Sequence, residues 1–210
     1  WRHWDGSGEV QSSCAKCHTP TGFMEYLATD AVTAQPLSYG MTCGACHTDE
    51  DFASGAPLRA VASVTFPGGT TITNDSDDPS FLCMTCHQGR TGMADIDAAT
   101  DGVDDTTVSA ALKFQNVHYL SAGASLYGDD ANVGYEYAGK TYAGKFGHYG
   151  GVSAQCITCH DVAGEKHSFH VEFGAACTGC HGEGTAGDPS TIRKSRTTDY
   201  DGDGAATEAL

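Results

Sequence analysis

Every cysteine of the chain lies in a five-residue pattern in which two thiols are separated by two residues and followed directly by a histidine. The pattern occurs five times and uses all 10 cysteines. The copies are Cys14-Ala-Lys-Cys17-His18, Cys43-Gly-Ala-Cys46-His47, Cys83-Met-Thr-Cys86-His87, Cys156-Ile-Thr-Cys159-His160 and Cys177-Thr-Gly-Cys180-His181. Zinc sites and disulfide frameworks do not require a histidine after each second cysteine. The pattern is typical of c-type haem attachment, and the sequence predicts five such groups.

The spacing follows from the chemistry of attachment. Two thiols add to the two vinyl groups on one edge of a haem, and two intervening residues let one helical turn present both sulfurs to that edge. The histidine that follows then points its imidazole at the iron as the proximal ligand. The predicted proximal ligands are His18, His47, His87, His160 and His181.

Five further histidines lie outside the motifs, and their number equals the number of second axial ligands that five six-coordinate irons need. They are His3, His118, His148, His167 and His170. Methionine is the competing sixth ligand and would raise the reduction potential. With enough histidine present, we expect bis-histidine ligation throughout. Because two imidazoles close both faces of an iron, such sites transfer electrons and do not bind substrate.

Three of these histidines raise particular questions. His3 lies in an N-terminal arm and can fold back onto its own subunit or reach the haem of a neighbouring one. His167 and His170 are three residues apart, so on a helix they share one face, and we expect each to serve a different iron.

The charge balance of the 210-residue chain is acidic, with 27 Asp and Glu against 11 Lys and Arg and a net charge of -16. Haem propionates add further negative charge. This argues against nucleic acid or an anionic membrane surface as a partner and favours basic proteins or cations. The alternative is that the charge only keeps the protein soluble. No apolar run reaches the roughly 18 residues of a membrane span. The chain starts at Trp1 without a signal-peptide pattern, so we expect its N-terminus to have been processed.

The expected fold is mostly irregular coil with short helices and small β-hairpins wrapped around five c-type haems. We expect a pentahaem domain over residues 1–190 and an acidic tail over residues 191–210. Alternating residues predict a hairpin with strands in 58–66 and 70–73, around the turn Pro67-Gly68-Gly69. A second hairpin is predicted over 133–142, turning at 138–140, and a helix from Thr106 or Thr107 to Tyr119.

The tail contains part of a calcium-loop pattern, with alternating carboxylates and a glycine at the sixth position. The candidate ligands are Asp199, Asp201 and Asp203. The twelfth position is Leu210 instead of glutamate, and Glu208 is out of register. The alternative interpretation is a solvated acidic tail.

The five motifs with their surplus histidines resemble the extracellular and periplasmic multihaem c-type cytochromes of metal-reducing and related prokaryotes. The stretch Asn116-Val-His-Tyr-Leu120, the segment 134–142 and the Asp-x-Asp-Gly-Asp-Gly segment also resemble that group. Some members polymerise into filaments, the cytochrome nanowires, in which a histidine of one subunit ligates a haem of the next. The resemblance assigns that role to His3, although this sequence departs from the best-known filament cytochromes in haem number.

The sequence therefore favours a subunit of an extracellular or cell-surface polymeric electron conduit. Its partners would be other copies of the chain, other cytochromes and reductases, and extracellular electron acceptors. The alternative is a soluble periplasmic shuttle to a terminal reductase. A third class, a multihaem nitrite or hydroxylamine-type oxidoreductase, needs one five-coordinate haem, often with lysine in place of the motif histidine. All five motifs here end in histidine, which disfavours an enzyme.

Overall fold

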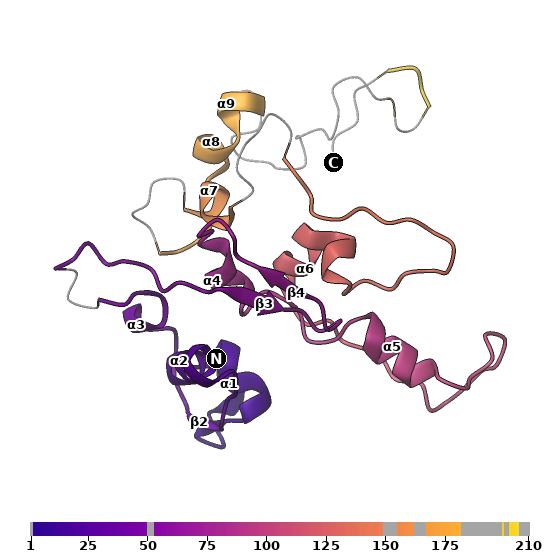
Figure 1. The fold of residues 1–210 in the computed structure, drawn as a ribbon, viewed down its shortest axis with the longest axis horizontal. Coiled ribbons are helices and arrows are strands. Elements are labelled where there is room, and N and C mark those ends of the chain that lie inside the picture. Colours follow the sequence, from indigo (N-terminus) through magenta and orange to yellow (C-terminus); the bar gives the residue numbers. More distant parts are fainter. Residues whose placement is uncertain are drawn as a thin grey trace. The chain divides into compact units, whose positions relative to one another are not determined.

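The computed structural model describes residues 2–49, 53–148, 155–161, 167–181, 199 and 202–205 (Figure 1). The chain divides into two compact units, Trp1–Gly147 and His148–Leu210. The predicted domain boundary between 190 and 191 lies outside the described residues. Within the described part of the chain, no helix is long and apolar enough to cross a membrane.

Unit 1 is mostly coil, interrupted by short helices and two small antiparallel sheets, as the sequence predicts. Strand β1 (Glu9–Val10) pairs with β2 (Gln35–Pro36), and β3 (Ser63–Thr65) pairs with β4 (Thr71–Thr73). The helices of this unit are η1 (Arg2–Trp4), α1 (Ser12–His18), α2 (Pro20–Thr29), α3 (Cys43–Cys46), α4 (Ser80–Met84), α5 (Met93–Thr100), α6 (Ala122–Tyr127) and η2 (Gly128–Ala131). In unit 2 the described helices are α7 (Cys156–His160), α8 (Phe173–Ala176) and α9 (Thr178–His181).

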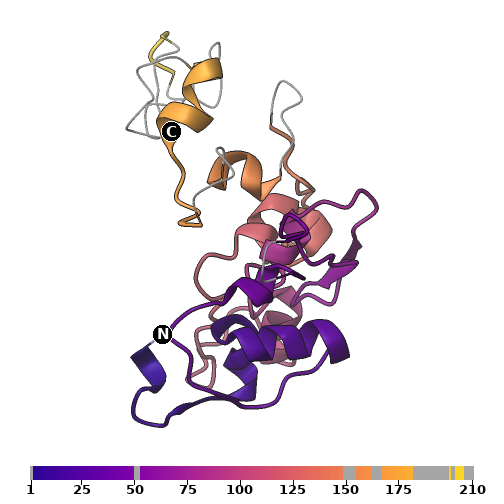
Figure 2. The same ribbon diagram turned by 90° about the vertical axis from the view of Figure 1, so that its left-hand side faces the viewer.

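A buried threonine joins the first motif helix to the helix that supports it. Thr19 ends α1 and caps α2, because its hydroxyl accepts from the Gly22 N–H at 2.9 Å and donates to the Ala15 carbonyl at 2.9 Å. Pro20 follows at the first helical position, which it favours. The two helices pack so closely that a Cβ on Gly22 would lie 2.5 Å from the Ala15 oxygen (Figure 2).

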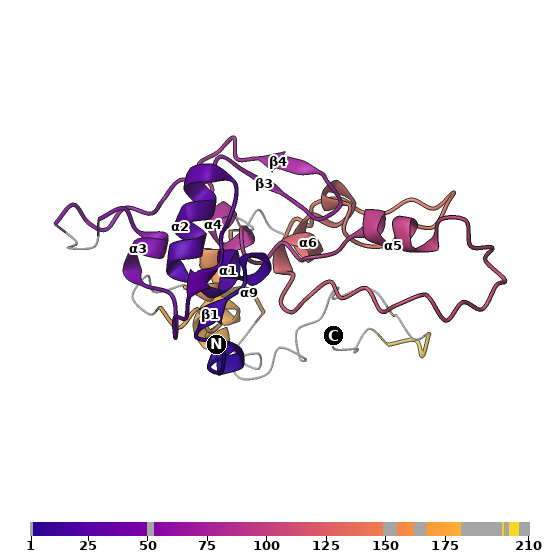
Figure 3. The same cartoon turned by 90° about the horizontal axis from the view of Figure 1, so that it is seen from below.

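The core of unit 1 lies where the β3–β4 hairpin meets α4 and α6 (Figure 3). The predicted hairpin is confirmed with shorter strands, Val64 facing Ile72 in register. Gly69 makes its turn at φ 87°, a conformation that glycine adopts without a steric penalty. The most deeply buried apolar side chains of this core include Ala45, Val64, Phe66, Phe81, Met84 and Ala131.

The predicted helix ending near Tyr119 is wrong. Residues 112–118 are coil, and His118 and Leu120 have left-handed backbones at φ 75° and 55° that no α-helix accommodates. Val108, expected on its apolar face, is 100% exposed, so no packing stabilises a helix here. The second hairpin is reduced to its turn, where the Lys140 N–H bonds the Tyr137 carbonyl, and residues 133–142 form no strands.

Candidate haem-binding sites

The third motif helix buries one side and presents its thiols on the other. Met84 and Thr85, the residues between the two cysteines, are each 1% exposed and face the core. Cys83 and Cys86 are half-buried, and His87 is exposed. Because the helix is anchored through its central residues, both sulfurs and the imidazole are left on the side where a flat macrocycle can lie.

The first two motifs follow the same arrangement. Ala15 and Ala45, which lie between the thiols of their motifs, are 0% and 1% exposed. In unit 2, α7 carries the fourth motif without any buried residue among those described. The fifth motif begins at Cys177, directly after α8, and continues through α9, and the side chain of Cys180 lies outside the described residues.

Three motif histidines each make the same type of hydrogen bond, in which the ring Nδ1 donates to a main-chain carbonyl. His47 bonds the Ala56 oxygen at 2.6 Å, His87 the Leu120 oxygen at 2.8 Å, and His160 the Phe169 oxygen at 2.8 Å. A carbonyl only accepts, so Nδ1 carries the proton and Nε2 keeps its lone pair. This bond orients a metal-bound imidazole and makes it a better ligand.

The three carbonyls share an unusual backbone conformation. Ala56, Leu120 and Phe169 are all in the left-handed region, at φ 52°, 55° and 51°. Residues with a Cβ enter this region at a cost of about 1–2 kcal/mol each. Sequence reasoning missed these residues, because no glycine, asparagine or aspartate marks the positions.

Two motif histidines face a histidine from outside the motifs. The ring centres of His18 and His118 are 6.1 Å apart at 78°, and those of His148 and His181 are 6.1 Å apart at 86°. Two imidazoles that coordinate one metal ion from opposite sides, at about 2 Å each, have ring centres roughly 6 Å apart. Burial, followed by the nearby His118, lowers the pKa of His18 and favours the neutral, ligating form. Each pair therefore has the spacing of two axial ligands on one iron.

The thiols of the first and third motifs lie against one another. The Cys17 Sγ is 3.9 Å from the Cys86 carbonyl, and the Cys86 Sγ is 3.9 Å from the Lys16 carbonyl. The hydrogen bond with Cys86 lowers the pKa of Cys17 to about 7 and raises that of Cys86. Two segments about 70 positions apart in sequence thus bring their attachment sulfurs together.

The remaining predicted distal ligands have other neighbours. His3 is exposed in η1, edge-on to Trp4 at 5.1 Å, and Trp4 in turn lies 5.1 Å from His18. His167 lies 6.0 Å from Phe169. The helix on which His167 and His170 would share a face is absent, since residues 167–172 are turn and coil. Their assignment to irons stays a prediction.

The calcium-loop residues are only partly described. Asp199 accepts hydrogen bonds from the main-chain N–H groups of Gly202 and Gly204, and Asp203 from that of Ala205. Asp201 lies outside the described residues, so the calcium site stays a prediction.

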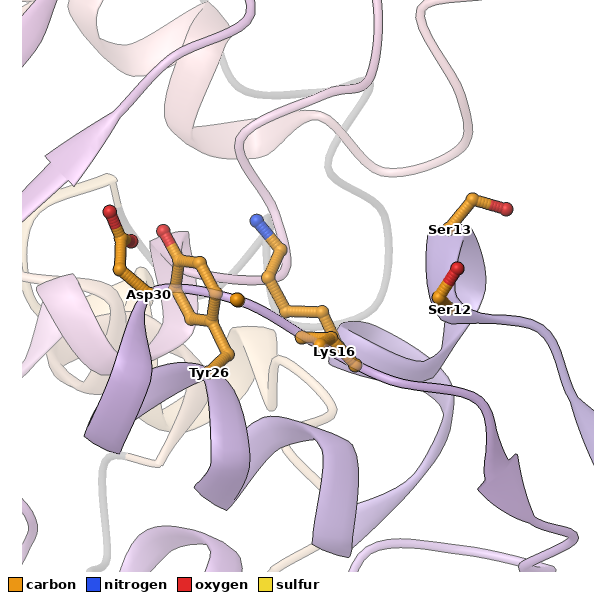
Figure 4. A pocket seen from close by; sticks show the side chains of 7 residues that line it. Ser12, Ser13, Lys16, Tyr26 and Asp30 are labelled. Atoms are coloured by element: carbon orange, nitrogen blue, oxygen red, sulfur yellow. The ribbon is translucent and has the colours of Figure 1, made fainter.

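A hollow of about 340 Å³ lies beside the first motif (Figure 4). Lys16 points from α1 toward Tyr26 of α2, with its Nζ 4.5 Å from the ring centre. Burial, followed by Asp30, raises the pKa of Tyr26. Neither a thiol nor an imidazole lines this hollow, so it is not where the motif would hold its cofactor. The contact of Lys16 with Tyr26 is a second contact between α1 and α2.

The donor sets of the described residues fit haem better than a bare metal ion. Among these residues no group of three or more His, Cys, Asp or Glu side chains could hold a metal. A haem iron takes four ligands from its macrocycle and needs only two from the protein. The paired imidazoles supply those two. Tyr119 and Leu120, which follow His118, are 80% and 75% exposed and offer apolar surface for a macrocycle to cover.

Arg90 should tune the potential of the first-motif site. Its positive charge contributes, after the Cys86 hydrogen bond and Lys16, to lowering the pKa of Cys17. A nearby cation disfavours the ferric state, so we expect Arg90→Gln to lower one midpoint potential by roughly 20–60 mV, up to a tenfold change in the reduction equilibrium. Spectroelectrochemical titration measures the shift. Arg59→Gln is the matched control, because Arg59 acts instead on Cys46 of the second motif. An Arg90→Gln titration identical to the wild type would contradict the prediction.

Known proteins with similar sequences are cytochromes. The family model "Cytochrome c7 and related cytochrome c" matches residues 1–88. The C-type polyheme cytochrome OmcB of Geobacter sulfurreducens is 30% identical over 212 residues, which cover 80% of this chain and 27% of that protein. The C-type polyheme cytochrome OmcC of the same organism is 30% identical over 216 residues, 86% of this chain and 25% of that protein.

The chain thus spans about a quarter of the length of these relatives. No solved structure matches it significantly. The similarity to both relatives covers most of the chain, and the family model covers the first three motifs. Together with the Cys-x-x-Cys-His motifs, these matches show that the chain belongs to the multihaem c-type cytochromes.

Proposed function

We propose that the chain binds five haems through its five motifs and conducts electrons along them. The observation that carries the proposal is the pairing of His18 with His118 and of His148 with His181 at 6.1 Å. A bound haem supplies an iron that cycles between ferric and ferrous and so accepts and releases one electron at a time. Two imidazoles at that iron leave no coordination position for a substrate.

Different residues of the chain would hold different parts of each haem. The motif thiols fix one edge of the macrocycle, and the motif histidine supplies the first axial nitrogen. The carbonyls of Ala56, Leu120 and Phe169 hold three of these imidazoles in the ligating tautomer. A second histidine, such as His118, closes the opposite face.

The haem count is tested by the mass of the intact, denatured holoprotein. Covalent attachment survives denaturation, so we expect a mass equal to the polypeptide plus five haems. A mass with four or fewer, in protein whose cysteines are otherwise unmodified, would show that one of the motifs does not carry a haem.

We further propose that the chain works as a subunit of an extracellular polymeric conduit, with copies of itself and extracellular acceptors as partners. The support is the position of His3. His118 already faces His18 at the spacing of an axial pair, and His3 lies exposed in η1. Its imidazole is exposed and takes no part in that pair, which supports its assignment to an iron of a neighbouring subunit.

His3→Ala should abolish assembly if this histidine ligates across subunits. Negative-stain microscopy should show filaments for the wild type and single particles for the variant. Arg2→Ala is the matched control, because Arg2 is exposed in the same element and only pairs with Asp5 at 3.8 Å. Filaments from His3→Ala with unchanged spectra would overturn the role of His3. Single particles from concentrated wild-type protein would overturn the filament and leave the haem proposal standing.

A further inference from the structure

Residues 116–121 follow the third motif in the sequence, but in the folded chain they contact both the first and the third motif. On one side, the ring of His118 faces His18 of the first motif at 6.1 Å. On the other, the Leu120 carbonyl accepts from Nδ1 of His87, the third motif histidine, at 2.8 Å. The two contacts are made by residues only two positions apart.

Main-chain hydrogen bonds tie this segment and its C-terminal flank to the third-motif region. The N–H of Arg90, three residues after His87, donates to the Val117 carbonyl at 3.0 Å. Just past the segment, the Gly123 N–H donates to the His87 carbonyl at 2.8 Å. The Asn116 side chain accepts from the His118 N–H at 2.9 Å and fixes the approach to the ring. The segment therefore has little freedom to move on one side without moving on the other.

The backbone conformation couples the two contacts further. His118 and Leu120 are both left-handed, at φ 75° and 55°. Residues with a Cβ remain in this region only when the surrounding contacts hold them there. Losing either contact therefore favours relaxation of both residues.

We propose that residues 116–121 are a shared positioning element, which presents His118 to the iron of the first motif and holds the proximal histidine of the third. This inference rests on the proposed haem function and goes beyond it, because it makes the ligand geometry of two haems depend on one segment. The contact between the Cys17 and Cys86 regions places the same two motifs side by side and supports it independently.

The structure offers a matched pair of substitutions to test this element. Leu120 and Ala56 are both left-handed residues whose carbonyls accept from a motif histidine. Proline cannot adopt a positive φ, so either substitution displaces the carbonyl. Only Leu120 has a histidine two positions before it, since residue 54 is a serine.

Proton NMR of the ferric holoprotein resolves the methyl signals of each haem, which are assigned through contacts to the residues of each motif. We expect Leu120→Pro to shift two sets, those of the first and third motifs, and Ala56→Pro to shift only the second-motif set. Leu120→Gly keeps both the carbonyl and the left-handed conformation, and we expect it to shift both sets by clearly less than Leu120→Pro does. Asn116→Ala is a milder variant, and we expect it to shift the same two sets by less.

A single shifted set in both Leu120→Pro and Asn116→Ala would overturn the shared element. Equal shifts from Leu120→Gly and Leu120→Pro would also overturn it, by showing that the side chain and not the carbonyl acts. The wild-type spectrum reports separately on the proposed function, because high-spin signals there would contradict bis-histidine ligation before any variant is compared.

Discussion

Replacing His118 with alanine should open one iron of the protein to solution. On the proposed ligation, His18 would remain as the proximal ligand and the coordination position opposite it would be empty. The ring centres of His18 and His118 lie 6.1 Å apart. A five-coordinate haem iron becomes high-spin and binds small ligands. We expect the ferric His118→Ala protein to show one high-spin haem among five and its reduced form to bind carbon monoxide, which the wild type should not.

Two controls separate ligand loss from general damage. Tyr119→Phe alters the exposed neighbour of His118 and should leave every haem low-spin. Added imidazole should restore the low-spin spectrum of His118→Ala, because it supplies the missing nitrogen without repairing the fold. A His118→Ala protein that stays low-spin and fails to bind carbon monoxide would show that His118 does not ligate the first-motif iron.

Removing the Phe66 ring should be the most destabilising single change in the core of unit 1. Phe66 is 2% exposed and its ring lies 5.9 Å from that of Tyr127. Truncating a buried phenylalanine to alanine typically costs about 3–5 kcal/mol in the free energy of unfolding, through lost burial and the cavity left behind. We expect Phe66→Ala to lower the denaturant midpoint of the holoprotein accordingly.

The same substitution, Phe66→Ala, should also disturb the packing of the third motif helix. Phe66 belongs to the buried cluster that contains Met84, and Met84 anchors the third motif helix from its inner face. Tyr39→Ala is the control, because Tyr39 is 71% exposed and its loss should change stability by no more than about 0.5 kcal/mol. Equal losses from the two variants would mean that the core is not organised around the β3–β4 hairpin.

The sequence alone predicts the attachment residues, because covalent chemistry fixes their types and spacing, and their assignment stays a prediction. The β3–β4 hairpin could be predicted as well, since Pro67-Gly68-Gly69 encodes its turn locally. The pairing of His118 with His18 could not, because the two residues are 100 positions apart and only the fold brings them together.

The failed helix before Tyr119 has the same cause. Its local sequence favours a helix, but the hydrogen bonds of Val117 with Arg90 and of Leu120 with His87 hold the chain in an irregular path. The left-handed carbonyl at Leu120 carries no sequence signal, because its conformation is imposed by tertiary contacts. The sites most important to ligand geometry were therefore the least predictable.

The most direct test of the account is the spin state of every haem in the purified wild-type protein. Electron paramagnetic resonance of the fully ferric holoprotein, calibrated against its total haem, counts low-spin and high-spin irons separately. The account predicts low-spin signals that sum to five haems per chain and no high-spin signal. A reproducible high-spin component amounting to one haem per chain would contradict it, because at least one iron would then lack its second histidine and be open to substrate.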